Sequence, residues 1–128
     1  MTNILVVDDA VDSAETLAFL FETMGHEAHV AFDGSAGLAQ AKKHGPHIIF
    51  LDLDMPVLDG YGAARAIREV PDTNHPFIVA LTGQGGEDVQ CKTAAAGFDF
   101  YMRKPPSTSD LLALVAVLEG RDREAGVL

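Results

Sequence analysis

The sequence predicts a doubly wound α/β domain, in which helices cover both faces of a parallel sheet. Two observations lead to this fold class. Short apolar runs alternate five times with helical patterns along the 128 residues, the order expected of successive strand–helix units. The clearest runs are continuously apolar, as in strands that are covered on both sides. Because crossovers between parallel strands are right-handed, such a chain places helices on both faces of one sheet.

The predicted strands are short runs rich in β-branched and aromatic residues. Four of them are clear, and the run over 27–32 is weaker. In chain order the five runs cover 4–7, 27–32, 48–51, 77–81 and 98–102. Runs of this length suit the strands of a buried parallel sheet.

The segments between the strands carry the i, i+3, i+4, i+7 apolar spacing of amphipathic helices. The first and last helices show it most clearly, at Ala14, Leu17, Ala18 and Phe21, and at Leu111, Leu114, Val115 and Leu118. Gly25 is a stop for the first helix, and Ser107 with Asp110 forms a capping box for the last. Weaker patterns predict helices over 35–43, 61–70 and 87–96.

Length and composition predict one domain over residues 3–119, followed by a short, mixed and frayed tail over 120–128. Nineteen acidic residues against nine basic ones give a net charge of −10, which disfavours binding to nucleic acid or to an anionic membrane. A single cysteine excludes an internal disulfide, and no apolar run is long enough to span a bilayer. With no signal peptide at Met1 either, we expect a cytoplasmic protein.

Polar side chains occur where the predicted strands end. Asp8 and Asp9 follow the first strand, and Asp52 directly follows the third. Thr82 follows the fourth strand, and Lys104 comes shortly after the fifth. Because the carboxyl ends of parallel strands share one edge of the sheet, we expect these five residues to meet in one pocket.

The residue types in this pocket suit phosphoryl transfer to a carboxylate. Three clustered carboxylates raise one another's pKa unless a cation neutralises them, and Mg²⁺ (or Mn²⁺) prefers such oxygen ligands. Lys104 adds a positive charge and Thr82 a hydroxyl donor. Transfers of this kind depend mainly on positioning and charge stabilisation, with a carboxylate as the nucleophile.

Four motifs carry a resemblance to a known family. They are Asp8-Asp9, the run D-L-D-M-P-V-L-D-G over 52–60, A-L-T-G over 80–83 and Lys104-Pro105. In this order and spacing, over residues 4–118, the chain resembles the receiver domain of two-component response regulators. The resemblance implies a flavodoxin-like fold with five helices and a five-stranded parallel sheet in the order 2-1-3-4-5. The runs A-L-T-G and A-G-F-D over 96–99 are especially similar to receivers carried by hybrid sensor kinases.

The resemblance implies a role for each residue of the pocket. Asp52 is the expected phosphoacceptor, and Lys104, Thr82 and the backbone N–H of Gly83 are expected to contact the phosphoryl group. The expected metal ligands are the side chains of Asp9 and Asp52 and the backbone carbonyl of Asp54, with Asp8 acting directly or through water. The Lys104-Pro105 peptide is the family's usual site of a cis bond. We interpret Pro56 and the Asp59-Gly60 pair as turn chemistry.

The resemblance also implies a switch. Tyr101 stands at the position of the family's switch aromatic, and its ring is expected to enter the space that Thr82 vacates when Thr82 moves toward a phosphoryl group. The surface from Glu87 through the last helix would report this state to a partner. Asp54 and Gln84 are expected to tune the lifetime of the phosphoryl group.

The implied protein is a stoichiometric phosphoacceptor that catalyses only its own phosphorylation and dephosphorylation. The implied donor is phosphohistidine on a histidine kinase or a histidine phosphotransfer protein. The implied recipient of the signal is a downstream protein or a covalently linked domain, with no nucleic acid bound directly and no membrane insertion.

Three other functions fit part of the pattern. A haloacid-dehalogenase-type phosphatase also uses an Asp-x-Asp pair, but it places the pair on the first strand and has Thr or Val where this chain has Pro56. A flavodoxin-like electron carrier needs a hydroxyl-rich phosphate loop after the first strand, where Asp8 and Asp9 would repel phosphate. The third alternative is a receiver that no longer takes a phosphoryl group and acts as a docking module.

Overall fold

The computed structural model describes residues 2–55, 59–70, 75–83 and 87–126. Strands and helices alternate five times, as the sequence predicts. The strands are β1 (Asn3–Val7), β2 (Glu27–Ala31), β3 (Ile48–Asp52), β4 (Phe77–Thr82) and β5 (Phe100–Arg103). The helices are α1 (Val11–Thr23), α2 (Gly34–His44), α3 (Gly60–Glu69), α4 (Glu87–Ala96) and α5 (Thr108–Gly126).

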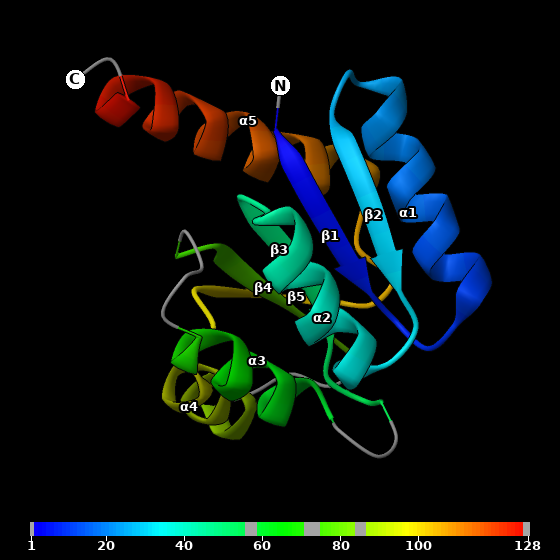
Figure 1. Ribbon diagram of the computed structural model, residues 1–128, viewed down its shortest axis with the longest axis vertical. Coiled ribbons are helices and arrows are strands. Elements are labelled where there is room, and N and C mark those ends of the chain that lie inside the picture. The colour runs from blue at the N-terminus through cyan, green and yellow to red at the C-terminus, as the bar shows by residue number, and fades with distance from the viewer. Residues whose placement is uncertain (1, 56–58, 71–74, 84–86, 127–128) are drawn as a thin grey trace.

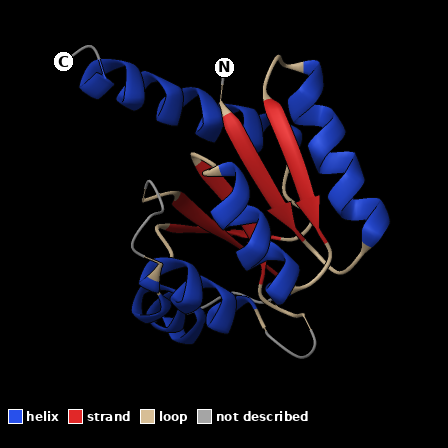
Figure 2. Ribbon diagram, in the orientation of Figure 1, coloured by secondary structure: helices blue, strands red, loops and turns tan. Residues whose placement is uncertain are grey.

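All neighbouring strands of the sheet are parallel, and their order is β2-β1-β3-β4-β5. The chain therefore reverses its direction of travel across the sheet after β2, which puts the topological switch point between β1 and β3. Figure 1 shows the sheet between two helical layers, and Figure 2 shows the strand ends pointing toward one edge. The flavodoxin-like fold and its strand order are confirmed.

Two hydrophobic clusters cover the two faces of the sheet. Successive strand residues point to opposite faces, so Leu5 and Val7 belong to one cluster and Ile4 and Val6 to the other. The first cluster packs the sheet against α2, α3 and α4, and the second packs it against α1 and α5. This two-sided burial explains the continuously apolar strand sequences.

Glycine and serine end and start two helices as predicted. Gly25, just after the end of α1, has φ of 89°, the left-handed conformation that favours glycine. At the start of α5 the Asp110 N–H donates to the Ser107 hydroxyl at 3.0 Å. The Ser107 contact satisfies a backbone N–H that the start of a helix leaves without a partner.

The predicted start of the fifth strand is wrong. The fifth strand begins at Phe100 rather than at Phe98, because the Phe98 N–H donates to the Thr93 carbonyl and so closes the end of α4. The Phe98 side chain is still buried, and its ring packs edge-on against Tyr61. Burial of an aromatic, rather than strand structure, produced the apolar signal at this position.

The predicted frayed tail is also corrected. Helix α5 continues through Gly126, so residues 120–126 extend the last helix. Figure 1 shows this end of α5 passing beyond the edge of the sheet. The domain limit at 119 remains a prediction. Within the described ranges, none of the helices is both long and apolar enough to cross a membrane.

Candidate functional site

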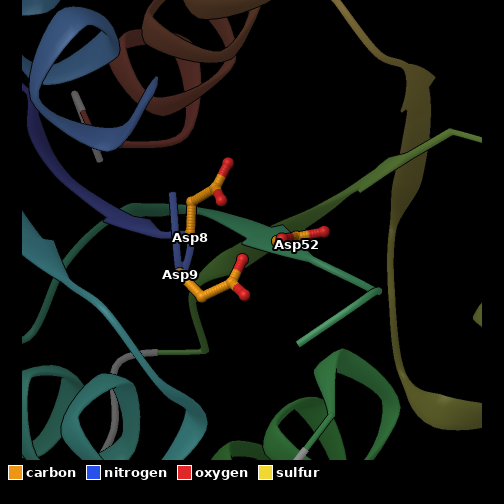
Figure 3. Close-up of side chains that lie close together, drawn as sticks. All are labelled: Asp8, Asp9 and Asp52. Atoms are coloured by element: carbon orange, nitrogen blue, oxygen red, sulfur yellow. The ribbon is translucent and has the colours of Figure 1, made fainter. Parts of the chain in front are cut away.

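The candidate site lies where the carboxyl ends of β1 and β3 meet. Asp8 and Asp9 follow β1, and Asp52 is the last residue of β3. One carboxylate oxygen from each of the three lies within 4.8 Å of the others. Figure 3 shows the three side chains gathered at the ends of these two neighbouring strands. The strand order creates this cluster, because β1 and β3 are adjacent in the sheet although 40 residues apart in the sequence.

Lys104 joins the cluster from the far end of the sheet. Its Nζ lies 2.9 Å from Oδ1 of Asp52 and 3.5 Å from Oδ2 of Asp8. The side chains of both aspartates are only 2% exposed, whereas that of Lys104 is 30% exposed. The ammonium of a partly exposed lysine thus pairs with two buried carboxylates. The peptide between Lys104 and Pro105 is cis, as the resemblance implies.

Burial and charge shape the protonation of this cluster. Burial raises the pKa of Asp8 above its usual value, and the negative charge of Asp52 adds to the rise. A hydrogen bond from the Ala10 N–H and the charge of Lys104 lower the pKa of Asp8 without cancelling the rise. Burial alone would lower the pKa of Lys104, but the hydrogen bond and charge of Asp52, with the charge of Asp8, raise it. Lys104 is therefore held in its charged form.

The charge of the cluster fits a divalent cation. Asp8, Asp9 and Asp52 together face the single ammonium group of Lys104, which leaves two negative charges uncompensated among these four groups. Carboxylate oxygens are the hard ligands that Mg²⁺ prefers, and a protein usually supplies only a few of them. Burial and the charge of Asp52 raise the pKa of Asp8, and a nearby cation would favour its ionised form.

Backbone contacts fix the two buried carboxylates. The Ala10 N–H donates to Oδ1 of Asp8 at 2.9 Å, and the Asp54 N–H donates to Oδ1 of Asp52 at 3.0 Å. The same Asp52 oxygen thus accepts from Asp54 and Lys104. Asp54 itself is exposed, and the structure places its carboxylate on the side of Gly83.

Gly60 supports the Asp52 backbone in a way that the sequence interpretation missed. Asp59 does act as predicted, capping α3 through a hydrogen bond from the Gly62 N–H at 2.8 Å. Gly60, however, is the first residue of α3, where a Cβ atom would sit 2.4 Å from the Asp52 carbonyl oxygen. The glycine is needed because the start of the helix packs directly against the backbone of Asp52. A glycine eight residues after Asp52 was the available signal. Pro56 lies outside the described residues.

Thr82 and Gly83 lie beside the acceptor strand. Thr82 ends β4 and is buried, and its carbonyl accepts from the Lys104 N–H at 2.7 Å. This bond ties the backbone of Lys104 to the end of β4. Gly83 is exposed, and its carbonyl accepts from Arg103 at 3.4 Å. Gln84 lies outside the described residues.

Tyr101 lies on β5, at the opposite side of β4 from the acceptor strand. It pairs with Ala80 in the strand register, and its half-buried ring packs against the cluster under α2, α3 and α4. Its hydroxyl accepts a hydrogen bond from the Gln90 side chain of α4 at 2.7 Å. Tyr101 thus connects β5 to α4. Its role as a switch stays a prediction.

Comparison with known proteins decides the family. The family model described as "Response regulator receiver domain" matches residues 4–116 of this chain. The chain belongs to this family. It is a receiver domain of two-component signalling, and this membership removes the phosphatase and electron-carrier alternatives.

The similar proteins differ in length, and this chain covers a different share of each. The sensory transduction protein RegX3 of Mycobacterium tuberculosis is 33% identical over 118 residues, covering 90% of this chain and 49% of RegX3. The hybrid signal transduction histidine kinase B of Dictyostelium discoideum is 32% identical over 120 residues, covering 85% of this chain and 6% of the kinase. The chemotaxis protein CheY4 of Vibrio cholerae has a TM-score of 0.86 at 26% identity, covering 92% of this chain and 98% of CheY4. The chain spans about half the length of RegX3.

Proposed function

We propose that this receiver domain accepts a phosphoryl group on Asp52 from a phosphohistidine donor, in a reaction that depends on Mg²⁺ (or Mn²⁺). The observation that carries the proposal is the position of the Lys104 ammonium, 2.9 Å from an Asp52 carboxylate that also lies within 4.8 Å of Asp8 and Asp9. A nucleophile, a lysine ammonium and a set of metal ligands therefore share one edge of the sheet. Phosphoryl transfer needs this combination.

In the proposed step, one carboxylate oxygen of Asp52 attacks the phosphorus atom. A phosphorus–oxygen bond forms while the phosphorus–nitrogen bond to the donor imidazole breaks, and the leaving nitrogen keeps the electron pair. Lys104, the Thr82 hydroxyl and the Gly83 N–H stabilise the charge on the phosphoryl oxygens. Asp8, Asp9, Asp52 and the Asp54 carbonyl would hold the metal ion, whose charge neutralises the same oxygens when it is bound.

Hydrolysis returns the domain to its starting state. Water attacks the phosphorus, the bond to Asp52 breaks, and inorganic phosphate leaves. The exposed carboxylate of Asp54 and the side chain of Gln84 are the groups proposed to tune this step. The domain then acts as a stoichiometric acceptor and catalyses only its own modification.

The proposed donor is a histidine kinase or a histidine phosphotransfer protein, in keeping with the receiver family and with the histidine kinase among the similar proteins. The recipient of the signal is a downstream protein or a covalently linked domain. Tyr101 and the surface from Glu87 through α5 would carry the change of state. We place the domain at residues 3–119 and the protein in the cytoplasm.

The test is phosphorylation by a small-molecule donor, followed by intact mass. Wild-type protein incubated with phosphoramidate and Mg²⁺ should gain the mass of one phosphoryl group, and Asp52→Asn should gain none. Asp54→Asn is the matched control, because it keeps the acceptor and the backbone carbonyl while changing a carboxylate two residues away. A wild-type protein that stays unmodified would identify the docking-module alternative.

A further inference from the structure

One side chain near the end of α3, that of Arg68, ties together three separate segments. Its Nε donates to the Gly97 carbonyl at 2.9 Å, and one Nη donates to the Pro76 carbonyl at 2.7 Å. The other Nη donates to the Asp99 carboxylate at 2.7 Å. Gly97 follows α4, Pro76 precedes β4 and Asp99 precedes β5, so a single guanidinium joins the ends of three elements.

The Asp99 carboxylate connects this contact to the centre of the sheet. The oxygen that accepts from Arg68 also accepts from the Ile78 N–H at 2.9 Å. The Asp99 N–H in turn donates to the Ile78 carbonyl at 2.8 Å. Ile78 is fully buried in β4. The Arg68 contact is therefore fixed to one of the best-buried strands of the domain.

The stem of Arg68 also packs under the end of α4. Gly97 has φ of 100°, its N–H donates to the Ala94 carbonyl, and the next N–H, of Phe98, donates to the Thr93 carbonyl. These are the bonds of a closed helix end. A Cβ atom on Gly97 would lie 2.9 Å from Cγ of Arg68. The arginine thus holds this end of α4 by hydrogen bonds and by close packing.

The rest of α4 is held more weakly. Among the α4 side chains that the structure describes, the inward ones are small, namely the half-buried Val89 and the buried Thr93 and Ala96, so the apolar area with which they dock is limited. Near its start, the exposed side chain of Gln90 donates to the Tyr101 hydroxyl. Bonds between neutral groups at the surface contribute less than bonds from an ionised donor such as Arg68.

We propose that Arg68 is a positioning residue that fixes the C-terminal end of α4 as a pivot. On phosphorylation the start of α4, which follows β4 and the acceptor site, is displaced, while the end at Gly97 stays in place. A partner would then read the tilt of α4 rather than a shift of the whole helix. This inference rests on the proposed function, because it needs a phosphoryl group at Asp52.

The test is backbone hydrogen exchange with and without Mg²⁺ and beryllofluoride, an analogue of a phosphorylated carboxylate. In wild-type protein we expect the exchange of residues 87–92 to change, and the exchange of Gly97 and Phe98 to stay within about twofold. Arg68→Lys keeps the positive charge and removes the planar fork. Exchange at Gly97 and Phe98 should then rise about tenfold or more already in the resting state, because a charge-assisted bond is lost.

Arg65→Lys is the control, since Arg65 is an exposed residue of the same helix and this variant should match wild type. Asp99→Asn is a milder variant that should show a smaller rise at the same two amides. Equal changes at both ends of α4 in wild type, or unchanged exchange at Gly97 and Phe98 in Arg68→Lys, would overturn the pivot. If phosphoramidate leaves Asp52 unmodified, the proposed function and the tilt both fail. The resting-state exchange would still decide separately whether Arg68 anchors α4.

Discussion

Asp8 and Asp52 are buried carboxylates that pair with one lysine at the edge of the sheet, and this arrangement affects the pKa of Asp8. Asp8 and Asp52 both lie against the Lys104 ammonium, with side chains that are almost wholly shielded from water. Burial raises the pKa of Asp8, and the negative charge of Asp52 adds to the rise. Without a bound cation, the burial and mutual repulsion of these carboxylates destabilise the folded domain. A bound cation would reduce this destabilisation.

Replacing Asp8 with Asn should stabilise the metal-free protein at neutral pH. Because the folded state raises the pKa of Asp8, it binds the proton more tightly than the unfolded chain does. Stability is therefore lost as pH rises from 3.8, the unfolded value, through the folded pKa. Asp8→Asn removes this loss, and urea unfolding in EDTA at pH 7 should show a higher free energy of unfolding than wild type.

Asp8→Asn should also change the response of the melting temperature to Mg²⁺. Added Mg²⁺ should raise the melting temperature of wild-type protein and have little effect on Asp8→Asn. The exposed Asp12, on the first turn of α1, provides the control, because Asp12→Asn should keep the full response to Mg²⁺. An equal response to Mg²⁺ in wild type and Asp8→Asn would show that Asp8 is not a ligand.

Gly60→Ala should damage both stability and phosphorylation. The new Cβ would meet the Asp52 carbonyl oxygen at 2.4 Å, which forces the acceptor backbone or α3 to move. Overpacking of this kind costs about 1–3 kcal/mol in free energy of unfolding. Gly120→Ala is the control, because nothing lies within 4 Å of the added atom in α5. Phosphoramidate labelling rates that are the same in both variants would contradict the supporting role of Gly60.

At the scale of single elements, α1 and α5 differ from α4 in the contacts that hold them against the sheet. Helices α1 and α5 bury large side chains such as Phe21 and Leu111 in the second hydrophobic cluster. Helix α4 offers mainly small side chains, so its end contacts through Arg68 matter more. The helix proposed to move is thus the one whose described buried side chains, Thr93 and Ala96, are small.

The start of α5 offers a clean test of capping. Ser107→Ala removes the hydroxyl that accepts from the Asp110 N–H, and we expect a loss of about 1 kcal/mol in free energy of unfolding. Ser13→Ala, inside α1 and exposed, should leave stability unchanged or slightly higher, since Ala is the better helix former. A Ser107→Ala variant as stable as wild type would mean that water replaces the cap.

At the scale of the whole molecule, the domain limit can be tested by truncation. Leu118 is buried in the second cluster, and Glu119 accepts from the Thr2 hydroxyl at 2.6 Å. A chain that ends at Gly120 should therefore keep its free energy of unfolding within about 0.5 kcal/mol. A chain that ends at Val117 loses both contacts and should be less stable by about 2 kcal/mol or more. Urea denaturation compares the two, and a large loss already at Gly120 would move the limit toward Gly126.

The fold could be predicted because its signals are local and repeated. Strands β1, β3 and β4 are clear apolar runs, and the polar residues Asp8, Asp52 and Lys104 stand at strand ends, where topology alone brings them together. The features that could not be predicted depend on contacts with backbone groups. Arg68 bonds to two carbonyls, which no residue type reveals, and Gly60 is set by close approach to the Asp52 backbone. Residues 120–126 lack an apolar stripe, so their helical structure left no clear pattern.

The register of the sheet has one more consequence. Asp52 pairs with Leu81 on β4, and Leu81 pairs with Met102 on β5, next to Tyr101. Two strand spacings of about 4.8 Å therefore separate the acceptor strand from the strand that carries the aromatic ring. A change at the end of β3 would therefore need to cross only about 10 Å, through the hydrogen-bonded peptides of the sheet, to reach the strand that carries Tyr101.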